Sequence, residues 1–190
     1  MAWLTIEEIN NLGFAKVGKN VLLSDKSSYY NCSQIEIDDF VRIDDFCVLS
    51  AGTGGISIGR NVHIAVYTSL IGSGKIILGE FSNLSSRVSV YSSNDDYSGS
   101  AMTNPTIPAE FTNVTHADVT IGRHVIIGSG SIILPGVVIE EGAAIGALSL
   151  VKKNCQPFTI YVGSPLKQIG VRKQKLLEVE KSFLKTEQNT

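Results

Sequence analysis

Residues 119–154 read VTIGRHVIIGSGSIILPGVVIEEGAAIGALSLVKKN, and a large apolar side chain recurs in them at every sixth position. These positions are Ile121, Ile127, Ile133, Ile139, Ile145 and Val151. A smaller residue stands two places before each of them: Val119, Val125, Ser131, Val137, Ala143 and Ser149. A period of six matches neither the roughly 3.6 of a helix nor the roughly 2 of a strand. It is typical of a parallel β-helix, in which three strand-and-turn units form one triangular coil.

The same register appears upstream with short interruptions. It predicts five coils, over residues 35–51, 56–72, 76–92, 119–136 and 137–154, with a weaker partial coil around 17–23. Glycines interrupt the register at 52–55 and 72–74, where a widened turn needs positive φ. The alternative is a β-sandwich with evenly spaced strands, but the six-residue spacing disfavours it. We therefore predict an all-β solenoid.

Length and composition favour one domain. We divide the 190 residues into an N-terminal cap (1–30), a β-helix (31–154) with an inserted loop (91–118), and a C-terminal tail with a helix (155–190). No apolar run is long enough to span a membrane, and the first residues do not resemble a secretory signal. The three cysteines, Cys32, Cys47 and Cys155, lack metal-type spacing, so we expect reduced thiols and a cytoplasmic protein.

The charge distribution is uneven along the chain. Residues 1–151 carry 8 basic and 15 acidic side chains, whereas residues 152–185 carry 8 basic and 2 acidic ones. An acidic body argues against nucleic acid binding, and a local basic end suits a small polyanion.

Short helices are expected at both ends. Thr5 and Glu8 form a capping box that starts one helix, and Gly13 can end it. Leu176, Val179 and Phe183 follow helical spacing near the C-terminus, and that helix is expected to be a cap or a packing arm against a neighbouring subunit. The 28 residues of the inserted loop contain no repeat, and a long excursion of this kind is usually functional.

Residues 121–167 carry a family resemblance. IGRHVIIGSGSIILPGVVI leads into IGALSLVKK and then VGSPLKQI, which resemble the repeats and the terminal GxPAKxI of the hexapeptide-repeat acyltransferases. The nearest branch includes maltose, galactoside and xenobiotic acetyltransferases and sugar O- or N-acetyltransferases. The resemblance implies a left-handed β-helix and acetyl-CoA as the acyl donor. We expect no metal. The resemblance further implies a homotrimer with active sites between subunits, and a sugar or nucleotide-linked sugar acceptor, as in lipopolysaccharide biosynthesis.

The expected coenzyme site lies in the last coils. Small residues at coil corners let a pantetheine arm approach the backbone, and the basic end can bind the phosphates of CoA. The predicted cofactor-binding residues are Gly128, Gly146, Ala147, Ser149, Lys152, Lys153 and Lys167, with Arg172 and Lys173 as further candidates.

The catalytic base is less clear, because the histidine that many relatives have at the start of the long loop is absent. Residues 91–97 read YSSNDDY instead. Strand alternation points His63 outward, so we predict a catalytic group of His63, Asp95 and Asn94, since an imidazole can exchange protons near neutral pH. The predicted substrate-binding residues are Asp96, Tyr97 and His116. His124 is expected at a coil corner. If the acceptor is an amine, a strong base from the protein is less necessary.

Two other functions are compatible with the sequence. Some left-handed β-helix trimers resemble γ-class carbonic anhydrases, in which three histidines bind a metal, but the spacing of His63, His116 and His124 is poor for one site. A non-catalytic trimeric scaffold is the other alternative.

Overall fold

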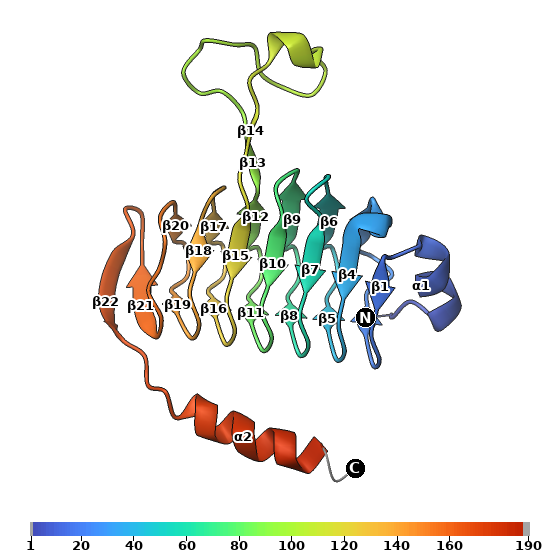
Figure 1. The fold of residues 1–190 in the computed structure, drawn as a ribbon, viewed down its shortest axis with the longest axis vertical. Helices are drawn as coiled ribbons and strands as arrows, with labels where there is room; N and C mark the ends of the chain where they lie inside the picture. The colour runs from blue at the N-terminus through green and yellow to red at the C-terminus, as the bar shows by residue number, and fades with distance from the viewer. Residues whose placement is uncertain (1, 188–190) are drawn as a thin grey trace.

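The chain winds into a triangular β-helix of about seven turns. A computed structural model describes residues 2–187. In Figure 1 the chain passes from a front strand through a lower strand to one at the back while it advances from right to left. This winding is left-handed, as the family resemblance implies, although parallel β crossovers are normally right-handed.

Three parallel sheets form the faces of the prism. The front sheet contains β1 (Lys16–Val17), β4 (Ile35–Ile37), β7 (Ile56–Ile58), β10 (Ile76–Leu78), β15 (Val119–Ile121) and β18 (Val138–Ile139). The lower sheet contains β2 (Leu22–Leu23), β5 (Arg42–Ile43), β8 (His63–Ile64), β11 (Asn83–Leu84), β16 (Ile126–Ile127), β19 (Ala144–Ile145), β21 (Thr159–Val162) and β22 (Lys167–Val171). The back sheet contains β3 (Ser28–Tyr30), β6 (Val48–Ala51), β9 (Ser69–Gly72), β12 (Ser89–Tyr91), β17 (Ile132–Ile133) and β20 (Leu150–Val151).

The core is the axis of the prism. All twelve repeat positions of residues 119–151 are buried there, at 0–2% exposure. Each large residue lies in register with its counterpart one turn away, so that Leu78 pairs with both Ile58 and Ile121. The six-residue repeat therefore maps directly onto stacked layers of apolar side chains.

The solenoid extends beyond the five expected coils at both ends. Residues 16–30, predicted as part of the N-terminal cap, instead form a complete first turn through β1, β2 and β3. At the other end, Cys155 bridges to Ile139, and β21 continues the lower sheet before β22 closes it in the antiparallel direction. Tyr161 takes the inward position in this last turn, and its hydroxyl accepts a hydrogen bond from the backbone N–H of Gln156. An aromatic side chain with a polar end departs from the Ile/Leu/Val pattern, which conceals the turn in the sequence.

Helices flank the prism. In α1 (Ile6–Leu12), Thr5 and Glu8 form the expected capping box, Gly13 ends the helix in the left-handed conformation, and Ile9 packs into the core cluster. The helix α2 (Leu176–Glu187) runs back along the corner between the front and lower sheets (Figure 1). Arg60 and Arg123 of that corner pair with Glu187 and Glu180 of α2. Within residues 2–187, neither helix has the length and apolar character to cross a membrane.

The long loop leaves the prism as a projecting arm. A two-stranded antiparallel hairpin, β13 (Ser93–Asn94) and β14 (Thr115–His116), forms its base. Two short 3₁₀ helices, Cys32–Gln34 and Ala109–Phe111, complete the elements, and the second lies at the tip of the arm (Figure 1).

Candidate active site

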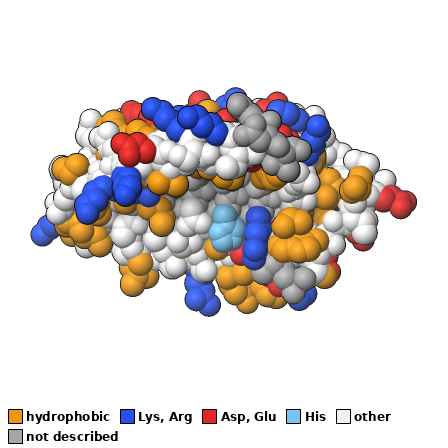
Figure 2. All heavy atoms as spheres, turned by 90° about the horizontal axis from the view of Figure 1, so that it is seen from below, with side chains coloured by type: hydrophobic (Ala, Val, Ile, Leu, Met, Phe, Trp, Pro, Cys, Tyr) orange, Lys and Arg blue, Asp and Glu red, His pale blue; other side chains and the backbone are white. Residues whose placement is uncertain are grey.

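A column of outward-facing side chains crosses the lower sheet. Arg42, His63, Asn83, Ile126 and Ala144 occupy the same position in successive turns. Each precedes a buried Ile or Leu, so strand alternation directs these five side chains away from the axis. Arg42, His63 and Asn83 are polar, whereas Leu22 before them and Ile126, Ala144 and Ile160 after them are apolar. Figure 2 shows this side of the molecule, where histidine and basic side chains border a shallow hollow with apolar groups nearby.

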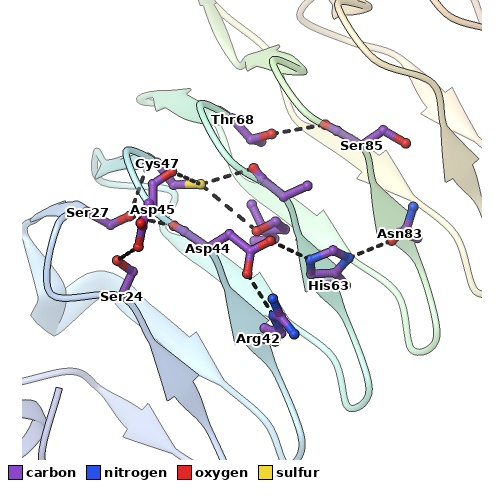
Figure 3. A network of polar contacts seen from close by, with 12 residues as sticks. Ser24, Ser27, Arg42, Asp44, Asp45, Cys47, His63, Thr68, Asn83 and Ser85 are labelled. Carbon is purple, nitrogen blue, oxygen red and sulfur yellow. Dashed lines mark hydrogen bonds and ion pairs between the residues drawn. The ribbon is translucent and has the colours of Figure 1, made fainter. Parts of the chain in front are cut away.

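His63 is held between two neighbours. Its Nε2 lies 2.9 Å from Oδ2 of Asp44, and its Nδ1 lies 2.9 Å from Oδ1 of Asn83 (Figure 3). The His63 side chain is 39% exposed, whereas that of Asp44 is only 9% exposed. The predicted outward orientation of His63 agrees with the structure.

Asp44 is the anchor of this group. Burial alone would raise the pKa of its carboxyl, but hydrogen bonds from His63 and Arg42 outweigh burial and lower the pKa. Nε of Arg42 donates to Oδ1 of Asp44 over 2.7 Å. Asp44 is therefore an anion that only accepts, and Nε2 of His63 must carry the hydrogen between them. Proton abstraction by His63 would have to use Nδ1, which faces Asn83.

The loop provides a second cluster. A hollow of about 400 Å³ lies where the arm leaves the back sheet. It is lined by Tyr91, Ser93, Asn94, Asp95, Tyr97, Ile132, Leu134 and Leu150. Three of the predicted site residues, Asn94, Asp95 and Tyr97, thus share one site, and Tyr97 stands at its mouth with 87% of its surface exposed.

Asp95 and Asp96 are adjacent but differ in environment. Oδ1 of Asp96 accepts hydrogen bonds from the N–H and hydroxyl of Ser98, and Oδ2 accepts one from the N–H of Ala101. Hydrogen bonds from Ser98 are the main reason that the pKa of Asp96 is lowered. Asp96 organises the loop, and its predicted contact with substrate would compete with these bonds. Asp95 is exposed and lines the hollow, so its carboxylate can face a ligand.

The other two histidines are bonded to neighbouring residues of the fold. Nδ1 of His116 lies 2.8 Å from Oγ of Ser93 at the base of the arm. His124 lies at a corner, as expected, stacks on Phe81, and bonds Glu180 of α2 through Nε2. In residues 2–187, no group of three or more His, Cys, Asp or Glu side chains is arranged to hold a metal ion. A three-histidine site is thus not assembled within one chain.

The predicted coenzyme residues divide into two sets. Gly128, Gly146 and Ala147 lie at the corner between the lower and back sheets, where a Cβ on Gly128 would collide with the backbone of Ala147. Ser149 faces inward, with its hydroxyl donating to the carbonyl of Gly146 and accepting from the N–H of Gly163, so that it supports the corner from within.

The basic candidates also differ from one another. Lys152, Lys153 and Lys167 are exposed and near the end of the prism. Arg172 instead directs its guanidinium at the carbonyl oxygens of His124, Gly142 and Ala143, so it is committed to the fold rather than open to a phosphate.

Sequence reasoning missed Asp44 and Asn83. A signal existed, because Arg42, His63 and Asn83 occupy equivalent repeat positions 21 and 20 residues apart. The His63 group and the loop hollow belong to different sheets, and no contact joins them within the described part of one chain.

Comparisons with known proteins fit this arrangement. The family described as bacterial transferase hexapeptide (six repeats) matches residues 118–153. An Escherichia coli protein named dTDP-4-amino-4,6-dideoxy-D-glucose acyltransferase is 56% identical over 183 residues, covering 96% of this chain and 95% of the relative. The chain belongs to the hexapeptide-repeat acyltransferases.

Comparison with solved structures shows that this acyltransferase resembles its relatives over the whole fold. AntD, an N-acyltransferase from Bacillus cereus solved with dTDP and 3-hydroxybutyryl-CoA, superposes with a TM-score of 0.93 at 48% identity. The match covers 99% of this chain and 98% of AntD. A maltose O-acetyltransferase from Clostridium difficile gives a TM-score of 0.59 at 26% identity, covering 88% of this chain and 75% of that enzyme.

Proposed function

We propose that the enzyme transfers an acyl group from acyl-CoA to the amino group of a dTDP-linked 4-amino-4,6-dideoxy sugar. The observation that carries this proposal is the near-complete match to the E. coli acyltransferase named for that acceptor. A variant of AntD, itself 48% identical to this chain, was solved with dTDP-4-amino-4,6-dideoxyglucose and coenzyme A together. Acetyl-CoA is our expected donor, and the acceptor choice makes this an N-acyltransferase.

The active form we propose is a homotrimer. Apolar side chains around the corner between the lower and back sheets support it: Leu148 is 77% exposed, and Ile126 and Ile132 are each 39% exposed. Apolar surface of this kind is typical of contact sites. Packing the lower sheet of one copy against the back sheet and arm of the next would unite the His63 group with a neighbouring loop hollow. The unpaired cysteines suit a reducing compartment, so we keep the cytoplasm as the proposed location.

The chemistry follows from an amine acceptor. The neutral nitrogen attacks the thioester carbonyl carbon, the C–S bond then breaks, and the sulfur leaves as CoA. One proton must leave the nitrogen, and the sulfur must gain one. We propose Asp95 as the group that holds the amine and accepts this proton, because its carboxylate faces the hollow and is not tied into the loop as Asp96 is. Asn94, beside it, suits sugar hydroxyls.

The expected coenzyme position uses the C-terminal turns. Lys152, Lys153 and Lys167 would pair with the phosphates of CoA, and the pantetheine arm would run along the corner at Gly128, Gly146 and Ala147 toward the N-terminal turns. This direction brings the thioester toward the polar residues of the lower-sheet column.

A thiol-release assay tests the proposal. Purified enzyme with acetyl-CoA is offered dTDP-4-amino-4,6-dideoxyglucose, the corresponding 4-hydroxy sugar nucleotide, maltose and chloramphenicol. We expect thiol release with the amino sugar alone. Asp95→Asn should lower turnover by roughly 10²- to 10⁴-fold, the usual contribution of an acid–base group. The matched control is Asp25→Asn, at an exposed aspartate of the first turn. Release with maltose but not with the amino sugar would overturn the proposal.

A further inference from the structure

Asn83 is a polar residue of the lower-sheet column to which the sequence pattern assigns no role. It lies on β11, one turn beyond His63, and is partly buried. Its Oδ1 faces Nδ1 of His63, and in Figure 3 its amide nitrogen points away from the imidazole. The described residues offer no hydrogen-bond acceptor to this nitrogen, although it carries two hydrogens.

The orientation of the Asn83 amide follows from charge. As the side chains are oriented, Oδ1 of Asn83 can only accept, so both ring nitrogens of His63 donate, Nε2 to the anion Asp44 and Nδ1 to Asn83, and the imidazole is in its charged, doubly protonated form. The chain of contacts therefore runs from the anion Asp44 through the imidazole to the amide oxygen. With its oxygen occupied, the amide presents its N–H₂ group to the open face of the sheet.

The next positions along the column are apolar. Ile126 follows Asn83 in register, and Ala144 follows Ile126. Successive turns are about 4.8 Å apart, so Asn83 lies roughly 10 Å from Ala144. Within this column, a thioester extended from the basic C-terminal end thus passes the apolar Ile160, Ala144 and Ile126 before it reaches the first polar side chain, Asn83.

We propose that Asn83 is a catalytic residue whose Nδ2–H donates to the thioester oxygen as negative charge develops there, with His63 and Asp44 as positioning residues. This inference rests on the proposed acyl transfer. When the acceptor nitrogen bonds to the carbonyl carbon, the C=O π pair moves to oxygen, and the Asn83 N–H stabilises that oxyanion. The pair then returns as the C–S bond breaks, and CoA leaves. A fixed amide in a partly apolar setting suits this role, since it needs no reorganisation.

Asn83→Asp is the sharpest test. Aspartate has nearly the same shape and still accepts from Nδ1 of His63, so the contact between the two side chains is kept. It lacks the N–H and would repel an oxyanion. We expect kcat to fall by roughly 10²- to 10³-fold or more, the effect of losing one oxyanion donor, while KM for acetyl-CoA changes less than about threefold. The kcat of Asn83→Ala should fall by a similar factor. The control is Thr120→Ala, because Thr120 is an outward-facing residue of the front sheet.

A double-mutant cycle tests the positioning role of His63. If His63 acts through Asn83, His63→Ala should lower kcat in the wild-type background but add less than about threefold to Asn83→Ala, because coupled residues are not additive. If the reductions in kcat of the two single variants instead multiply in the double variant, His63 acts independently of Asn83. That result would overturn its positioning role.

The two proposals fail in different ways. The variants are compared with whichever acceptor the wild-type enzyme turns over, so lack of transfer to the dTDP-linked amino sugar refutes the proposed function alone. Wild-type kcat in Asn83→Asp, or a change confined to KM, would overturn the oxyanion role. Thermal unfolding of each variant shows whether the fold is kept, and Asn83→Ala provides the comparison if Asn83→Asp does not fold.

Discussion

Gly128→Ala separates two explanations for the small residues at the corner between the lower and back sheets. In the structure, a Cβ at Gly128 would lie 2.4 Å from the backbone N of Ala147 and 2.8 Å from its Cα. Ordinary contact begins at 3.4 Å, so the methyl group is too close to three backbone atoms, by about 1.0 Å for N of Ala147 and by about 0.6 Å for its Cα and for the carbonyl carbon of Gly146. Backbone atoms cannot rotate aside as a side chain can, and the turns must move apart.

The cost can be estimated from what holds those turns together. Gly128 N donates to the carbonyl of Ile145 over 2.7 Å, and Leu148 N donates to that of Ser129 over 2.9 Å. Separating the turns strains both bonds, so we place the loss near the top of the roughly 1–3 kcal/mol range for overpacking, at about 2–3 kcal/mol. For a chain of this size, that loss lowers Tm by roughly 5–10 °C.

The assay is thermal and urea unfolding at one fixed protein concentration, because assembly makes Tm concentration-dependent. Ser129→Ala, at the exposed neighbouring position, is the control and should stay within about 0.5 kcal/mol of wild type. CoA affinity is measured in parallel by calorimetry. Stability equal to that of Ser129→Ala would refute the packing argument, and loss of CoA binding at unchanged stability would assign Gly128 to the coenzyme site.

Three further predictions concern the phosphates, acid stability and assembly. Replacing Lys152, Lys153 and Lys167 together by Ala should weaken CoA binding more than dephospho-CoA binding in calorimetry, and unchanged affinities would place the phosphates elsewhere. The pKa of Asp44 is lowered in the folded state, so its carboxylate stabilises the fold above the ordinary value of 3.8, and this contribution disappears as pH falls through the lowered value. Asp44→Asn should therefore lose stability at neutral pH but show a shallower decline in urea midpoints below about pH 4, and an unaltered decline would contradict this. Light scattering at micromolar concentration should give the mass of a trimer. A monomer mass would contradict the proposed homotrimer.

The repeat predicted the core because each of its positions has a single environment. Ile121, Ile127 and Ile133 are six residues apart, and each fills the axis one face after the other. The terminal turns were harder, because Tyr29 and Tyr161 stand where the interior turns have aliphatic residues. Tyrosine is tolerated there because its hydroxyl finds a backbone partner, as that of Tyr29 does at the carbonyl of Ser24.

The candidate site was only partly predictable. Strand alternation directs His63 outward, and this was correct because the period of two is local. The partners of His63 come from the turns before and after it, about 20 residues away in each direction, and identifying them requires the register between turns. Asp95 and Asp96 look equivalent in sequence, yet the folding of the arm commits only Asp96 to Ser98 and Ala101. The catalytic role of His63 stays a prediction.

The sequence by itself determined the class of fold, the axis residues and the outward position of His63, because these follow from periods of six and two that neighbouring residues obey together. It also carried the family resemblance to acyltransferases. Only the tertiary structure decided that Asp44, His63 and Asn83 form one chain of contacts, that the hydroxyl of Ser149 bonds to Gly146 and Gly163, and that Arg172 is used by the corner carbonyls. Those contacts depend on which turns stack and on how far apart they lie. The spacing of turns is set by backbone hydrogen bonds between residues distant in the chain, which no local pattern encodes.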